Sequence, residues 1–117
     1  MNEILNAKIS DTKLGYEDHG IFTCQLCLEG DGWVCCYGGY ALDNYSKEQN
    51  KRIATRQGFQ AIIELMKTLE VDNWENLKGK YVRVEGQGWG GKITKIGHLI
   101  KDKWFSFEEL FEDEKGE

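Results

Sequence analysis

The chain has 117 residues, of which 40% are hydrophobic and 30% are charged, and its formal net charge is −5. This profile is typical of a soluble globular protein, so we expect residues 1–117 to form a single domain. No apolar run approaches the ~20 residues that span a bilayer, and the start of the chain lacks the features of a signal peptide. The sequence therefore predicts a cytoplasmic protein with reduced thiols and no membrane partner. Its acidic charge makes nucleic acid an unlikely partner, because non-specific binding needs a basic surface.

Alternating hydrophobicity predicts three strands in the first part of the chain. Residues 3–14 alternate weakly and indicate an edge strand. Residues 21–29 alternate well, and the EGDG loop after them predicts a hairpin to a strand over 33–42. This third strand carries bulky residues on both faces, so we expect it to be central or covered by a partner. The pair Gly38-Gly39 predicts a bulge within it.

A helix is expected next. Ser46 is a suitable N-cap, and Gln49 three residues later completes a capping box. Five apolar residues then recur at helical spacing: Phe59, Ile62, Ile63, Met66 and Leu69. They predict that one stripe of a long helix, from about Ser46 to Leu69, packs on a sheet.

The rest of the chain predicts two strands and two short helical pieces. Residues 71–79 indicate a helical turn, residues 81–85 a strand, and KITKIGHLI the last strand, while SFEELFED near the end indicates one or two helical turns. The order β-β-β-α-β-β predicts an α+β fold with an antiparallel sheet of about five strands, one main amphipathic helix and a short C-terminal helical piece. We expect Trp33, Cys35 and Tyr37 on the sheet face that this helix leaves open. A second copy of the chain would cover them, which predicts a homo-oligomer.

All four cysteines lie in residues 22–39, spaced as C-x2-C and then C-C. A zinc knuckle places two cysteines on a tight turn so that both sulfurs converge on the ion. Here the alternation runs straight through, so Cys24 and Cys27 should point to opposite faces, as should Cys35 and Cys36. We therefore expect no metal and no cofactor, and we interpret these cysteines as small apolar residues. A zinc site is the alternative.

No catalytic set is identified. The loop GQGWGG resembles a glycine-rich nucleotide loop, but a strand rather than a helix is predicted after it, which favours a hairpin loop that exposes Trp89. His98 shares the parity of its apolar neighbours, and His19 lies in an acidic turn. Because no nucleophile, base and carboxylate arrangement follows from the spacing, we expect a protein that is not an enzyme.

The start of the predicted helix is basic. Lys47, Lys51, Arg52 and Arg56 lie within about three turns, and the two arginines, four residues apart, would share a face. Arginine pairs bind phosphate in a bidentate manner, and a helix N-terminus adds positive potential. The functional interpretation is an anion site, and the alternative is a solvated basic face.

Two segments, EDHGIFTCQLCLEGDGWVCCYGGYALDNY (17–45) and IGHLIKDKWF (96–105), with WENLKGKYVRV between them, resemble a family of small, mostly uncharacterised phage and prophage proteins. The resemblance covers nearly the whole chain and contains no motif of known mechanism. It implies a context, since small phage proteins without catalytic apparatus often act against host defence. Some inhibit defence nucleases, and others are oligomers that sequester nucleotide immune signals.

These observations lead to one main hypothesis: a non-enzymatic phage-type binding protein that counters host immunity by sequestering a small phosphorylated, nucleotide-like ligand in a homo-oligomer. Six residues form the candidate site: Arg52, Arg56, Tyr40, Trp89, His98 and Lys101. The arginines would hold phosphate, an aromatic ring would stack on a base, and the last two would add contacts. The alternatives are a protein-binding inhibitor of a host defence complex, similar to anti-CRISPR proteins, and a single-stranded nucleic-acid accessory protein.

Overall fold

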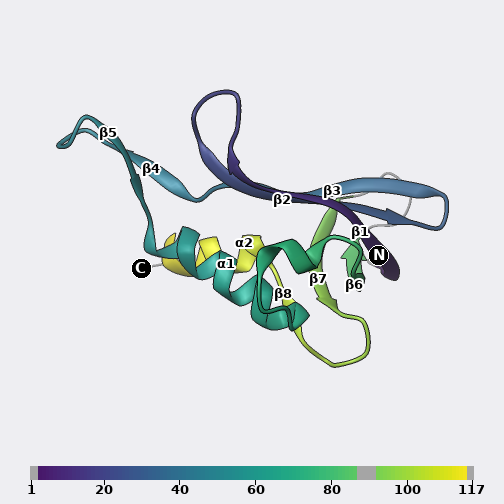
Figure 1. The fold of residues 1–117 in the computed structure, drawn as a ribbon. Helices are drawn as coiled ribbons and strands as arrows, with labels where there is room; N and C mark the ends of the chain where they lie inside the picture. Colours follow the sequence, from purple (N-terminus) through teal and green to yellow (C-terminus); the bar gives the residue numbers. More distant parts are fainter. Residues whose placement is uncertain (1–2, 87–91, 116–117) are drawn as a thin grey trace.

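The computed structural model describes residues 3–86 and 92–115, in which two helices cover one face of an antiparallel sheet (Figure 1). The sheet has six strands in the order β3-β2-β1-β6-β7-β8, and two further strands form a separate hairpin. The sheet strands are β1 (Glu3–Tyr16), β2 (Phe22–Gly30), β3 (Trp33–Ala41), β6 (Tyr81–Gly86), β7 (Ile93–His98) and β8 (Trp104–Phe105). The hairpin is β4 (Asp43–Ser46) and β5 (Lys51–Ala54). The helices are α1 (Arg56–Leu69), the short 3-10 helix η1 (Trp74–Leu77) and α2 (Phe107–Lys115).

The α+β class and the antiparallel sheet expected from the sequence are confirmed, with six strands in the main sheet rather than about five. The two-residue strand β8 supplies the extra strand. The hairpin β4–β5 stands where the first half of a long helix was expected, and it projects away from the sheet (Figure 1). No helix among the described residues is long and apolar enough to cross a membrane.

Strands β1 and β3 exchange the positions expected for them. The strand β1 is central, because its first half pairs with β6 and its second half with β2. Its alternation is weak since only Ala7 and Ile9 on it are buried. The strand β3 pairs with β2 alone among the described strands and forms an edge of the sheet. The bulge predicted at Gly38-Gly39 is confirmed, because the β2–β3 register shifts there.

The core lies between the sheet and the two helices. The main buried apolar residues are Ile9, Leu26, Leu28, Val82, Val84 and Ile96 from the sheet, and Ala61, Leu65, Leu69 and Phe107 from the helices. The buried stripe of α1 therefore differs from the predicted one, and Phe59 is 67% exposed. The physical reason is that the small residues Gly58 and Ala61 lie on the face that packs closely, which leaves Phe59 at the margin of that face.

The short helix α2 covers Tyr37, one of the three residues for which a second copy was expected to provide cover. Tyr37 is buried, and its ring centroid lies 5.1 Å from that of Phe107 in α2. The Tyr37 hydroxyl donates to the Thr94 carbonyl at 3.3 Å and accepts from the Phe107 N–H at 3.1 Å. Trp33 and Cys35 pack against the same core. The sequence interpretation that placed these side chains on the open face is wrong, because all three lie on the face that carries the core and α2 packs on Tyr37.

Candidate ligand-binding site

Arg52 and Arg56 do not share a helix face. Arg52 lies in the strand β5, and Arg56 is the first residue of α1 and is exposed. The helix begins here because Thr55 is its N-cap: Thr55 is extended, and its hydroxyl accepts from the Gly58 N–H at 2.9 Å. The Ser46 hydroxyl does accept from the Gln49 N–H at 3.2 Å, as a capping box requires, but this bond lies in the turn between β4 and β5. The predicted start of the helix was therefore wrong.

Arg52 is bound to a carboxylate of its own chain. Its Nε donates to Asp43 Oδ2 at 3.0 Å, and one terminal nitrogen donates to Oδ1 at 2.8 Å and to the Asp43 carbonyl at 3.2 Å. Asp43 is buried and also accepts from the Phe22 N–H at 3.3 Å. The hydrogen bonds from Arg52 lower the pKa of Asp43. The Arg52 guanidinium thus bridges the two strands of the hairpin, while the Phe22 N–H bond to Asp43 joins the hairpin to β2. The two-arginine clamp expected from the sequence does not form.

His98, the last residue of β7, and Lys101, in the turn between β7 and β8, lie together with Glu70 at the end of α1. His98 Nδ1 accepts from the backbone N–H groups of Ile100 and Lys101 at 3.1 and 3.0 Å. Lys101 Nζ lies 2.8 Å from Glu70 Oε2, and Lys103 Nζ lies 2.9 Å from the same oxygen. Hydrogen bonds from these two lysines lower the pKa of Glu70 to about 2. Glu70 thereby ties the turn to the end of the helix.

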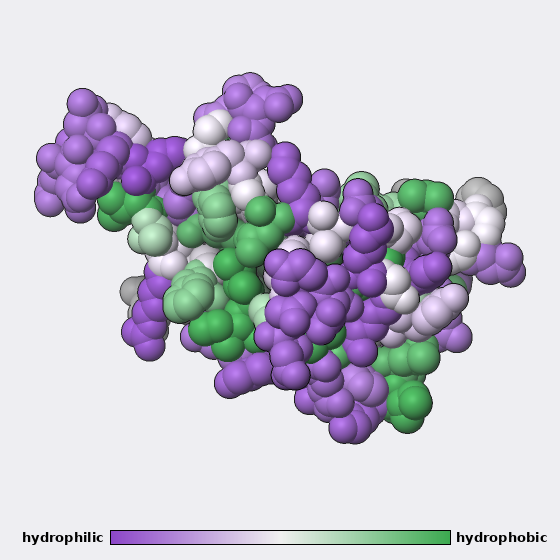
Figure 2. Space-filling model, in the orientation of Figure 1, coloured by the Kyte–Doolittle hydropathy of each residue, from purple (hydrophilic) through white to green (hydrophobic). Residues whose placement is uncertain are grey.

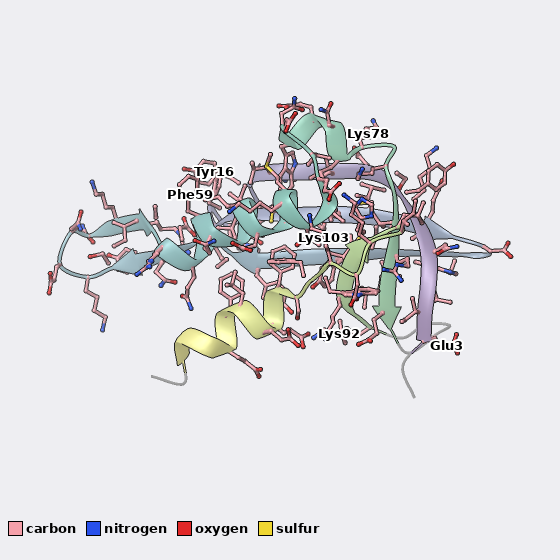
Figure 3. The ribbon with its side chains drawn as sticks, turned by 90° about the horizontal axis from the view of Figure 1, so that it is seen from below. Glu3, Tyr16, Phe59, Lys78, Lys92 and Lys103 are labelled. Carbon is pink, nitrogen blue, oxygen red and sulfur yellow. The ribbon has the colours of Figure 1, made fainter. Side chains whose placement is uncertain are left out.

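Tyr40, by contrast, lines a polar hollow with a volume of about 460 Å³ between β3, the start of α1 and α2. The hollow is lined by Tyr40, Ala41, Asn44, Thr55, Gln57, Lys92, Glu108, Phe111 and Glu112. Figure 3 shows Lys92 beside α2, away from Tyr16 and Phe59. Of the six residues predicted from the sequence, Tyr40 alone lines this hollow, and Trp89 lies outside the described residues.

The charges in the polar hollow meet at Glu108. Lys92 Nζ lies 2.5 Å from Glu108 Oε1, and the Tyr40 hydroxyl donates to the same oxygen at 3.2 Å. The hydrogen bond from Lys92 lowers the pKa of Glu108, and burial, followed by the charge of Glu108, raises the pKa of Tyr40. Tyr40 therefore stays a neutral donor, and its ring stacks on Phe107 with centroids 5.3 Å apart.

Sequence reasoning missed Lys92, Glu108, Asn44 and Gln57. Each is an ordinary polar residue in the sequence, and no spacing connects them. They come together because α2 folds back over β3 and because the chain turns at β4. The EEL stretch that begins α2 and the lysine after the glycine loop were the available signals, and neither points to a ligand without the fold.

A second hollow, of about 340 Å³, lies on the other side of the first turn of α1. It is mostly apolar, with Tyr16, Phe22, Phe59 and Ile62 among its lining residues and the Asp43–Arg52 pair in its wall. Tyr16 and Phe59 are each 67% exposed and lie next to each other (Figure 3). Figure 2 shows hydrophobic residues gathered beneath the β1–β2 loop and over the start of α1.

The cysteines alternate between the two faces of the sheet as predicted. Cys24 and Cys35 lie on the face covered by the helices, and Cys27 and Cys36 lie on the open face. Burial raises the pKa of the Cys24 thiol to about 12. Within residues 3–86 and 92–115, no group of three or more His, Cys, Asp or Glu side chains is placed to hold a metal ion.

No protein-family profile matches this chain, and comparisons with curated proteins and with solved structures also returned no match. The residues themselves must therefore carry the argument about function.

Proposed function

We propose that this chain is a non-enzymatic binding protein that captures a small phosphorylated, nucleotide-like ligand in the polar hollow. The observation that carries the proposal is the composition of that hollow: two aromatic rings, an ammonium group, two amide side chains and two carboxylates around about 460 Å³. Ligand sites are typically clefts of about 300–1,000 Å³ with apolar walls and a few convergent polar groups.

Each part of such a ligand has a partner in the hollow. The phosphate would lie against Lys92 and the backbone N–H groups of the first turn of α1, where the helix dipole adds positive potential. The carboxylates of Glu108 and Glu112 suit the hydroxyls of a sugar, as acidic side chains do in nucleotide-binding proteins. Tyr40 and Phe111 offer aromatic surface to a base.

The balance of charge narrows the ligand class. Two carboxylates and one ammonium line the hollow, so a second or third phosphate charge would be repelled. A ligand with one negative charge and free sugar hydroxyls, such as a cyclic mononucleotide, matches this balance better than a triphosphate does. Arg56 is not among the residues that line the hollow, but it precedes Gln57, which is, and we propose it as a further phosphate contact.

The same proposal includes a homo-oligomer, now on the basis of β3. This edge strand, WVCCYGGYA, contains no charged residue and no proline, the residues by which edge strands usually resist pairing with another chain. Val34 on it is 75% exposed. A second copy pairing along β3 would use backbone groups that no other described strand pairs with. The resemblance to small phage proteins is the basis for proposing that the captured ligand is a host immune signal.

Calorimetry and native mass spectrometry test the proposal together. The full chain is titrated with 3′,5′-cyclic mononucleotides, cyclic dinucleotides and ADP-ribose, and the subunit number is read from the native spectra. We expect one of the singly charged ligands to bind, and we expect Lys92→Ala and Tyr40→Leu to weaken binding by about tenfold or more through the loss of a charge-assisted contact and of the aromatic surface. Lys47→Ala, in the turn of the hairpin, is the matched control and should bind as the wild type does.

Arg56→Ala decides whether that arginine belongs to the site, because its side chain is exposed and its loss should leave the fold intact. Thermal unfolding of each variant separates lost binding from lost structure. If no ligand binds the wild type, or if Lys92→Ala and Tyr40→Leu both bind as it does, capture in the polar hollow is refuted.

The apolar hollow favours a second candidate function, the protein-binding inhibitor. Exposed Tyr16 and Phe59 beside a hollow lined by Phe22 and Ile62 suit an apolar side chain of a partner protein. This function would be supported if the wild type binds a host protein but no nucleotide, and if Phe59→Ser abolishes the binding of that protein.

A further inference from the structure

The fold brings together one cysteine from each of the two sequence pairs. Cys27 in β2 and Cys36 in β3 are directly opposite in the register, and their Sγ atoms lie 3.6 Å apart. Both are free thiols on the open face of the sheet, where Cys36 is exposed and Cys27 is partly exposed. Because side chains alternate between the faces of a strand, Cys24 and Cys35 point to the covered face, while Cys27 and Cys36 meet on the open face.

The backbone at this pair is already suited to a disulfide. Directly opposite residues of antiparallel strands have Cα atoms about 4.5–5.5 Å apart, which falls within the range of about 4.4–6.8 Å found for disulfides. The two sulfurs are in contact at 3.6 Å, and a bond of about 2.05 Å requires rotation of the two side chains rather than movement of the strands.

We propose that Cys27 and Cys36 form a reversible oxidation site, which a small-molecule disulfide of the glutathione class converts into a cross-strand disulfide. The two thiols and one disulfide RSSR give the Cys27–Cys36 disulfide and two molecules of RSH. The protein pair loses two electrons and two protons, and the reagent gains both. The established thiol–disulfide exchange mechanism supplies the two steps.

Cys36 is the entry point for the reagent. Because it is the more exposed thiol, its thiolate attacks one sulfur of RSSR and releases RS⁻, which leaves a mixed disulfide on Cys36. Cys27 then loses its proton to solvent and attacks the Cys36 sulfur, which forms the ring and expels the second RS⁻. The hydrogen bond with Cys36, partial burial and the nearby Asp11 carboxylate raise the pKa of Cys27, in keeping with its place as the second nucleophile.

The other two cysteines are not placed for this reaction. Cys24 is 1% exposed and faces the core. Cys35 faces the helices, packs against the core, and its thiol donates to the Cys36 carbonyl at 3.6 Å. The four cysteines therefore divide into two that serve packing and two that can react with each other.

The test is oxidation of the full chain with oxidised glutathione, followed by acid quenching, alkylation and intact-mass analysis. We expect two of the four thiols to disappear without attached glutathione, a peptide map with a Cys27–Cys36 link, and full reversal by dithiothreitol. In Cys27→Ser, Cys36 should instead retain one glutathione. Cys35→Ser is the matched control and should form the link as the wild type does.

Three results would overturn the proposal. These are four free thiols in the oxidised wild type, a link that includes Cys35 or joins two copies of the chain, and glutathione that remains on wild-type Cys36 without ring closure. The wild-type map and the Cys35→Ser control decide the question even where Cys27→Ser folds poorly.

Discussion

The two hollows on either side of the first turn of α1 differ in how their polar groups are used. Asp43 and Asn44 are neighbours in β4, but Asp43 lines the apolar hollow and Asn44 lines the polar one. Thr55 lines both hollows. In the apolar hollow the charged groups, Asp43 and Arg52, bind each other. That hollow therefore offers a partner mainly apolar surface, whereas the polar hollow presents groups of several chemical kinds. Two hollows lined by neighbouring residues of the chain therefore present different chemical groups to a ligand.

Of the variants that probe the two hollows, Gly58→Ala should have the largest effect on stability, because Gly58 lines the apolar hollow and packs directly on Leu42. A Cβ at this position would lie 2.1 Å from the Leu42 carbonyl oxygen. Alanine in place of glycine normally stabilises a helix by about 1 kcal/mol, but here the clash must move α1 away from the chain that leads into β4. We expect a net loss of about 3 kcal/mol in the free energy of unfolding, measured by urea denaturation.

Gly15→Ala is the matched control, because a Cβ there would meet no atom within 4 Å. It should change the free energy of unfolding by no more than about 0.5 kcal/mol. Equal stability of Gly58→Ala and the wild type would contradict the close approach of α1 to Leu42, and with it the shared wall of the two hollows.

The fold was predictable from sequence where the chemistry is local. The alternation over 21–29, the bulge at Gly38-Gly39 and the strand over 81–85 depend on neighbouring residues, and each is present in the structure. The start of the helix was not predictable, because the Ser46–Gln49 hydrogen bond serves a turn as well as a cap. In the structure the Asp43–Arg52 pair and the β4–β5 backbone pairing form a hairpin at this place instead of a helix.

The candidate site was less predictable than the fold. Tyr40 was found as an aromatic residue that could stack on a base, but Lys92 and Glu108 have no sequence signal that connects them. Sixteen positions separate these two residues, and they form an ion pair only because α2 packs beside the start of β7. Cys27 and Cys36 illustrate the same limit, since strand register, which loops and bulges set, determines which cysteines meet.

Asp43→Asn should have the second largest effect, and it acts on the apolar hollow alone. The carboxylate accepts two hydrogen bonds from Arg52 and one from the Phe22 N–H. Replacing it with an amide removes the charge-assisted bonds and keeps the volume, so we expect a loss of about 2 kcal/mol in the free energy of unfolding at neutral pH. Asp11→Asn, whose weak pair with Lys78 is exposed, should lose less than about 0.5 kcal/mol.

The Asp43 effect should depend on pH with a defined sign. Hydrogen bonds from Arg52 hold the pKa of Asp43 below its value of about 3.9 in an unfolded chain. A lowered folded-state pKa contributes stability above the unfolded pKa and loses it as the pH falls through the folded one. The difference between wild type and Asp43→Asn should therefore be constant from neutral pH to about pH 5 and shrink below about pH 4. A difference that stays constant in acid would contradict a charged Asp43 in the fold.

Phe59→Ser should have the smallest effect on stability and the clearest effect on the comparison between the hollows. The side chain is 67% exposed at the mouth of the apolar hollow, so most of its surface is already in contact with water. We expect the free energy of unfolding to change by no more than about 0.5 kcal/mol, whereas Leu65→Ala on the buried stripe of the same helix should cost about 2–5 kcal/mol. Binding of a nucleotide in the polar hollow should be unchanged, because Phe59 does not line it.

A loss of stability near that of Leu65→Ala would mean that Phe59 belongs to the core after all, as its helical spacing in the sequence predicted. A loss of nucleotide binding with full stability would mean that the two hollows act as one site, since Thr55 is the only residue that both share in the described part of the chain.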